Sequence, residues 1–155
     1  MFKSFQPPKT SVRQKFYVDT SVWRDYFEDR SDGLRPLGEF AFRFLKWCQS
    51  QHCAILVSDA VELELRIFAS GEKVRLIFQE FEESIVHVVA TTAEVEEART
   101  FWEKNRKRFP LADILHSIVA RDNDAVLVSR DNHFKEIEIV QSFKPEEINP
   151  EDDGF

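Results

Sequence analysis

The chain has 155 residues, of which 43% are hydrophobic and 32% charged, a composition typical of a soluble globular protein with one domain. Its net charge of −7 excludes a protein that coats nucleic acid by bulk charge, although it leaves room for a nuclease with an acidic site. No apolar run approaches the roughly 20 residues that span a bilayer, and the polar, proline-broken start is unlike a signal peptide. We therefore expect a cytoplasmic protein that does not bind membranes.

Strand-like and helix-like segments alternate along the chain. We expect a flexible lead-in, a folded domain and an acidic tail over residues 1–15, 16–143 and 144–155. Apolar runs predict strands at 16–18, 54–57, 85–89 and 125–128, with a short edge strand near 137–140. Helical spacing of apolar residues predicts helices between the strands, one of them opening with the capping box Thr91-Thr92-Ala93-Glu94. Alternating strands and helices predict an α/β fold with a parallel, doubly wound sheet.

Four acidic residues lie at strand ends or on the helices that follow strands: Asp19, Glu64, Asp113 and Asp131. The carboxyl ends of the strands in an open α/β sheet converge on one crevice. Several carboxylates in one crevice repel each other unless a cation is present. Ligation by oxygen alone suits Mg²⁺ or Mn²⁺, so the sequence predicts a site for one of these ions.

Structural roles for three of these acids remain open at this stage. Asp19 is also a preferred helix N-cap, and Asp131 followed by Asn132 suits a turn. Asp113, near the start of its predicted helix, would gain from the helix macrodipole without any ligand.

Glu64 must be separated from its neighbour Glu62. Two residues along a helix correspond to a rotation of about 200°, so the two side chains face nearly opposite ways. Glu62 stands at capping-box spacing from Asp59, which favours a structural role for it. Glu64 is therefore the better candidate for the crevice, with a solvated helix residue as its alternative.

The motifs around the four acids resemble those of PIN-domain nucleases. In chain order, from about Phe16 to Phe134, they read Val-Asp-Thr-Ser-Val-Trp, Val-Ser-x-x-Val-x-x-Glu-Leu, Ala-Asp-Ile-Leu-His-Ser-Ile-Val-Ala and Leu-Val-Ser-Arg-Asp-Asn-His-Phe. The chain is most similar to the small, single-domain VapC-type toxins. This resemblance implies a three-layer α/β/α fold with a central, mainly parallel sheet, a Mg²⁺ or Mn²⁺ site and endoribonuclease activity. It gives catalytic and metal-binding roles to Asp19, Glu64, Asp113 and Asp131.

Polar residues near the acids complete the predicted site. The resemblance gives supporting roles to the hydroxyl groups of Thr20 and Ser129, and Ser129 with Asn132 could orient a metal-bound water. The densest basic run could guide RNA phosphates, or could equally be a solvated helix end; its residues are Lys104, Arg106, Lys107 and Arg108.

The acidic residues predict a metal site, and the resemblance implies a metal-dependent ribonuclease that acts as the toxin of a toxin–antitoxin pair. The resemblance implies a small antitoxin protein as partner and is compatible with a homodimer. The alternative is a non-catalytic PIN-like module that binds RNA or a protein. Other phosphate chemistry is disfavoured, because the chain has no Gly-rich phosphate loop and carries Ser21 where a haloacid-dehalogenase phosphatase needs a second aspartate.

Overall fold

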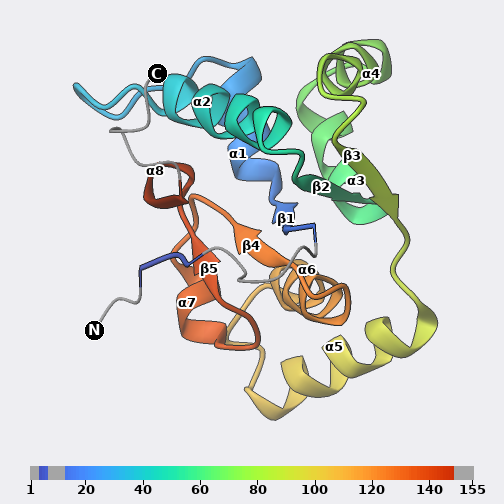
Figure 1. Cartoon of the computed structure of the whole chain (residues 1–155). Helices are drawn as coiled ribbons and strands as arrows, with labels where there is room; N and C mark the ends of the chain where they lie inside the picture. Colours follow the sequence, from blue (N-terminus) through green and yellow to red (C-terminus); the bar gives the residue numbers. More distant parts are fainter. Residues whose placement is uncertain (1–3, 7–12, 149–155) are drawn as a thin grey trace.

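A five-stranded sheet forms the centre of the computed structural model, which describes residues 4–6 and 13–148 (Figure 1). All its strands are parallel, in the order β3-β2-β1-β4-β5. They are β1 (Lys15–Val18), β2 (Ala54–Ser58), β3 (Ile85–Val88), β4 (Val126–Val128) and β5 (Ser142–Phe143). The predicted α/β class and the parallel sheet are confirmed.

Helices cover both faces of this sheet. They are α1 (Thr20–Phe27), α2 (Leu37–Ser50), α3 (Asp59–Phe68), α4 (Gly71–Glu80), α5 (Thr92–Lys104), α6 (Leu111–Asp122), α7 (His133–Ile137) and α8 (Pro145–Ile148). Helices α1 and α2 pack together on one side, and α5 and α6 pack together on the opposite side (Figure 1). None of the helices in the described part of the chain is long and apolar enough to cross a membrane.

Most of the predicted helices and strands form, and the exception is the last predicted strand of the chain. The capping box of α5 is present, with Thr91 and Glu94 each accepting a hydrogen bond from the other's backbone N–H. The edge strand expected near 137–140 is wrong: α7 continues to Ile137, Glu138 adopts a left-handed conformation with φ 60°, and β5 begins only at Ser142. Burial of Ile137 as the last residue of a helix accounts for the apolar signal.

The predicted division into lead-in, domain and tail stays a prediction, because much of 1–15 and 144–155 lies outside the described residues. Within the described part, Lys15 already belongs to β1. The segment Pro145–Ile148 forms α8, and Ile148 is buried.

The sheet reverses its direction of growth between β1 and β4. From β1 the chain adds β2 and β3 on one side, and it then returns to add β4 and β5 on the other. A doubly wound sheet has its ligand crevice at this switch point, beyond the carboxyl ends of the two strands. Asp19 follows β1 and Ser129 follows β4, and the backbone N–H of Asp19 donates to the Val128 carbonyl at 2.9 Å. The fold therefore places both residues at the edge of that crevice.

A buried ion-pair network ties α1 to the loop after β4. The completely buried carboxylate of Asp25 accepts hydrogen bonds from Arg30 Nε at 2.8 Å and from Arg130 Nε at 3.2 Å. Arg130 also donates from Nη1 to Glu146 of α8 at 2.5 Å. Because Arg130 stands between Ser129 and Asp131, this network fixes the backbone of the loop that carries both.

Replacing Asp25 with alanine should therefore destabilise the fold strongly. The substitution leaves Arg130 partly buried with one of its two carboxylate partners, and breaking a buried pair in this way costs about 3 kcal/mol. Urea unfolding measures the loss. Asp122→Ala removes an exposed carboxylate that pairs with Arg121 and should cost less than about 1 kcal/mol. Equal losses in the two variants would contradict the role given to the network.

Candidate functional site

Asp19 is both a helix cap and a member of the site. It is the N-cap residue of α1, and its Oδ2 accepts hydrogen bonds from Ser21 Oγ and from Ser129 Oγ, each at 2.9 Å. The residue is only 6% exposed. Hydroxyl groups from two chain segments thus hold one oxygen of a nearly buried carboxylate, and the capping role and the site role exist together.

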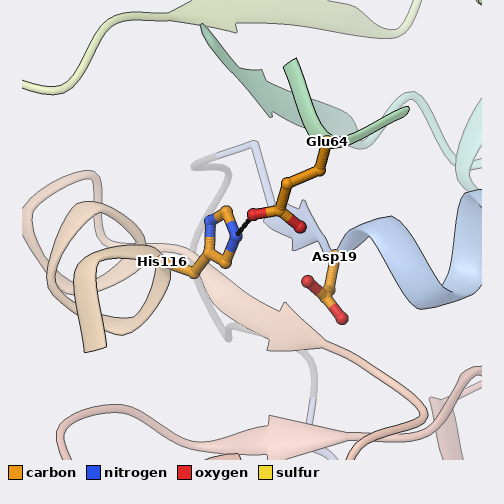
Figure 2. Close-up of side chains that lie close together, drawn as sticks. All are labelled: Asp19, Glu64 and His116. Carbon is orange, nitrogen blue, oxygen red and sulfur yellow. Dashed lines mark hydrogen bonds and ion pairs between the residues drawn. The ribbon is translucent and has the colours of Figure 1, made fainter. Parts of the chain in front are cut away.

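Glu64 projects from α3 toward the same place. Its Oε2 accepts a hydrogen bond from Thr20 Oγ1 at 2.7 Å, and its Oε1 lies 2.6 Å from His116 Nε2 (Figure 2). Burial opposes ionisation of this carboxyl, but the hydrogen bonds from His116 and Thr20 outweigh burial and lower the pKa of Glu64. The Glu64 carboxylate is therefore ionised, and each of its two oxygens is held by a hydrogen bond.

Glu62 lies away from this group. Its Oε1 is 3.0 Å from His87 Nδ1, on the side of α3 toward β3. The capping box expected between Asp59 and Glu62 is absent from the described residues, because Ser58 is the N-cap of α3 and Asp59 accepts instead from the Ala90 N–H. The opposite orientations of Glu62 and Glu64 follow from their spacing along the helix.

Asp113 and Asp131 meet around a histidine. Nδ1 of His133 lies 3.5 Å from Asp113 Oδ2 and 3.2 Å from Asp131 Oδ1. The backbone N–H of Asp131 donates to Ser129 Oγ at 3.0 Å, so this hydroxyl links Asp131 to Asp19.

The carboxyl of Asp113 is under electrostatic strain. Burial and the negative charges of Asp19 and Asp131 raise the pKa of Asp113 from 3.8 to about 6. His116 and His133 offset only part of this effect. A carboxyl whose pKa is raised by other carboxylates is one whose ionised form a bound cation would stabilise.

Within the described part of the chain, the potential metal ligands form two groups, in each of which the ligand atoms lie within 4.8 Å of one another. One group consists of Asp19, Glu64 and His116, and the other of Asp113, Asp131 and His133. Figure 2 shows the first group converging from the junction of β1 and α1, from α3 and from α6. The four acids supply oxygen ligands and carry like charges, and the charges of Asp19 and Asp131 add to burial in raising the pKa of Asp113. This combination fits a hard divalent cation such as Mg²⁺ or Mn²⁺.

Sequence reasoning did not assign a role to His116 or Tyr17. His116 is completely buried, and its ring also lies 2.6 Å from the Tyr17 hydroxyl. Burial lowers the pKa of His116, but the carboxylates of Glu64 and Asp19 outweigh burial and leave it raised. Two features of the sequence could have indicated these residues. Tyr17 is a polar residue within the apolar run Phe-Tyr-Val, and His116 lies one helical turn after Asp113.

The other predicted residues lie around the two groups. The side chain of Asn132 is exposed at the start of α7 and makes no hydrogen bond within residues 13–148. Lys104 ends α5, and Arg106 and Lys107 follow in left-handed conformations with φ of 54° and 57°. Arg108 pairs with Glu136 of α7 at 3.7 Å, which places the basic segment beside the helix that begins with His133.

A doubly wound α/β domain with acidic side chains grouped at its switch point is the class of protein defined by this fold and site. Residues 16–140 match the family model of the PIN domain, and the chain belongs to this family. No curated protein of similar sequence was found.

Three solved structures illustrate the likeness in fold. VapBC from Salmonella typhimurium bound to DNA has a TM-score of 0.64 and 14% identity, and the match covers 85% of this chain and 98% of that one. VapBC2 from Rickettsia felis bound to a promoter DNA fragment has a TM-score of 0.63 and 16% identity, with 84% and 98% covered. The sarcin–ricin-loop-cleaving toxin VapC20 from Mycobacterium tuberculosis has a TM-score of 0.62 and 17% identity, with 87% and 99% covered. The fold is that of toxins found in VapBC complexes.

The strain on Asp113 predicts a pH-dependent stability. Its carboxyl ionises at a higher pH in the folded than in the unfolded chain, so stability falls as the pH rises from about 4 to about 6 and stays low above that. In EDTA, Asp113→Asn should match the wild type near pH 4 and exceed its free energy of unfolding by roughly 3 kcal/mol at neutral pH. Urea unfolding across this range measures the difference.

Asp124→Asn serves as the control, because it changes the same side chain at an exposed turn. This variant should follow the wild-type profile. If Asp113→Asn also followed it, Asp113 would not carry the strain inferred from its neighbours.

Proposed function

We propose that this protein is a divalent-metal-dependent endoribonuclease and the toxin of a toxin–antitoxin pair. The observation that supports the proposal is a pair of potential ligand groups at the switch point of a PIN domain, one with Asp19 and Glu64 and the other with Asp113 and Asp131, linked through the Ser129 hydroxyl. Like-charged carboxylates at one place cost stability, and the cost is compensated when they bind a cation. The likeness in fold to toxins of VapBC complexes supports the same class of function.

Bound Mg²⁺ or Mn²⁺ would acidify a water molecule and neutralise charge on the scissile phosphate. The four acids would hold the ion, and Thr20 and Ser129 would orient Glu64 and Asp19 through the hydroxyl contacts described above. With a pKa of about 6, Asp113 is largely ionised at neutral pH and can take up a proton at little cost. Asn132, which is exposed beside Asp131, would orient a metal-bound water together with Ser129.

The basic segment from Lys104 to Arg108 would bind the RNA backbone. It leads directly into α6, which carries Asp113, and Arg108 connects it to α7. Lys107 Nζ lies 4.7 Å from the centre of the Trp102 ring, so a cation and an aromatic face stand together. Single-stranded nucleic acids bind to such combinations of positive charge and ring surface.

A small antitoxin protein would cover the acidic crevice, through an Arg or Lys side chain that pairs with the carboxylates. Leu63 and Ile67 support a protein partner, because they flank Glu64 on α3 and are 66% and 76% exposed. Exposed apolar residues beside a site are typical of protein interfaces, and a homodimer could use the same surface. We propose a cytoplasmic location, where RNA and antitoxin are both accessible.

Cleavage of RNA tests the nuclease directly. Labelled ribosomal RNA, transfer RNA and a pool of structured hairpins are incubated with Mg²⁺ or Mn²⁺, or with EDTA. We expect metal-dependent cleavage that Asp113→Asn and Glu64→Gln reduce at least about 100-fold, because a metal ion contributes several kcal/mol to such a reaction. Asp124→Asn should cleave like the wild type.

Mn²⁺-induced thermal stabilisation provides the second measurement. A functional acidic site should gain stability on binding the ion, and Asp19→Asn should reduce that gain. A folded protein that neither cleaves RNA nor is stabilised by Mn²⁺ would contradict the proposal and favour a non-catalytic PIN-like module.

RNA binding by the basic segment should be visible in its salt dependence. In an Asp113→Asn background that does not cleave, Arg106→Gln and Lys107→Gln should each lower the slope of log K against log salt by about 0.7, the value for one phosphate contact with a single strand. Filter binding between low and moderate salt measures the slope. Arg43→Gln, on α2 and paired with Glu39, is the control and should leave it unchanged.

A further inference from the structure

A line of buried polar side chains runs through the centre of the fold to Glu64. Tyr17 Oη lies 2.6 Å from both Ser58 Oγ and His116 Nδ1. The other ring nitrogen of His116, Nε2, lies 2.6 Å from Glu64 Oε1. The line therefore runs from Ser58 through Tyr17 and His116 to Glu64, and joins residues of β1, the end of β2, α6 and α3.

Burial makes this line dependent on its internal contacts. Tyr17, Ser58 and His116 are each completely buried, so water cannot replace a missing partner. An unpaired polar group in such a place is costly, whereas a fully paired network is rigid. The polar atoms of this network are all paired, because Ser58 Oγ also accepts a hydrogen bond from the Val61 N–H at 3.1 Å.

The contacts leave His116 only one way to face an ionised Glu64. Nε2 must carry a proton, because an unprotonated ring nitrogen would set its lone pair against the carboxylate. The Tyr17 hydroxyl satisfies Nδ1 in either protonation state of the ring, as donor to the neutral form or as acceptor from the charged form. Tyr17 thus holds the ring in the orientation in which Nε2 donates to Glu64.

Both ring nitrogens of His116 are consequently engaged by protein atoms. The residue belongs to the group of potential ligands with Asp19 and Glu64, but it has no nitrogen lone pair to offer an ion while these contacts persist. We infer that His116 and Tyr17 are positioning residues: His116 fixes the Glu64 carboxylate for cation binding, and Tyr17 acts through His116. The inference rests on the proposed metal site.

Fixing Glu64 matters because its carboxylate stands at the end of a long side chain on a helix. Thr20 holds one oxygen at 2.7 Å and His116 holds the other, so the carboxylate is oriented before any ion arrives. Partners that orient metal-binding side chains typically change metal affinity by about 10- to 100-fold. Loss of the His116 contact should therefore appear in ion binding itself, without any measurement of catalysis.

Two amide substitutions of His116 separate its two contacts. The glutamine amide can reach the position of Nε2 and donate to Glu64, whereas the asparagine amide reaches only the position of Nδ1, toward Tyr17. Measured by calorimetry, we expect His116→Gln to keep the Mn²⁺ affinity within a few-fold of the wild type. His116→Asn should weaken it about 10- to 100-fold.

Tyr17→Phe tests whether the tyrosine acts through the histidine. The variant should also weaken Mn²⁺ binding, but Tyr17→Phe combined with His116→Asn should bind no more weakly than His116→Asn alone. Tyr26→Phe is the matched control: it removes a hydroxyl that donates to Glu80 at 2.5 Å, and Mn²⁺ affinity should not change. If Tyr17→Phe fails to fold, the comparison of His116→Gln with His116→Asn still decides the inference.

Pulsed electron paramagnetic resonance of bound Mn²⁺ identifies a directly bonded nitrogen. We expect no imidazole coupling from His116. A nitrogen coupling that both His116 variants abolish would show that His116 is a ligand, and would overturn the inference. Unchanged Mn²⁺ affinity in His116→Asn and Tyr17→Phe, together with loss of binding in Glu64→Gln, would also overturn it. Failure of the proposed function would look different, because the wild-type protein itself would then bind no Mn²⁺.

Discussion

Mutual repulsion among carboxylates at the switch point is the constraint on which the rest of the structure depends. The ends of β1 and β4 bring Asp19 beside the Asp131 loop, while α6 adds Asp113 from the opposite layer. Burial is the first cause of the raised pKa of Asp113, and the charges of Asp19 and Asp131 add to it through this repulsion. The fold must oppose this repulsion with other interactions, and a bound cation would neutralise it.

Hydrogen bonds from hydroxyl and imidazole groups stabilise Asp19 and Glu64 against this repulsion, so a permanently charged partner is not needed at every acid. Ser21 and Ser129 hold Asp19, while Thr20 and His116 hold Glu64. The permanent positive charge of Arg130 is paired with buried Asp25 and with Glu146 rather than with the four acids, and it anchors the loop between Ser129 and Asp131. A cationic side chain among the four acids would occupy the place that the ion needs.

The sequence was sufficient for those features that depend on local pattern. Apolar runs predicted the first four strands, and rotation along a helix distinguished Glu64 from Glu62. It was insufficient where a contact joins distant segments: Tyr17 and His116 are 99 residues apart, and neither the strand nor the helix around them carries a local sign of their meeting. The misplaced last strand has a different cause, since Ile137 and Ile139 suit a strand as well as the end of a short helix.

The acidic balance of the chain is compatible with an RNA substrate because the positive charge is distributed unevenly. Arg24, Arg30 and Arg130 are all paired with carboxylates and so are poorly available to phosphates. Arg106 and Lys107 have no carboxylate partner within residues 13–148, and they lie on the loop that leads into the Asp113 helix. An RNA backbone repelled by the acidic groups would be attracted at such unpaired cations, and a strand that crosses this loop would come close to the Asp113 helix. If the proposed function holds, the net negative charge would restrict the direction from which RNA approaches, and a cation held by the acids would supply the attraction that the acids alone would not.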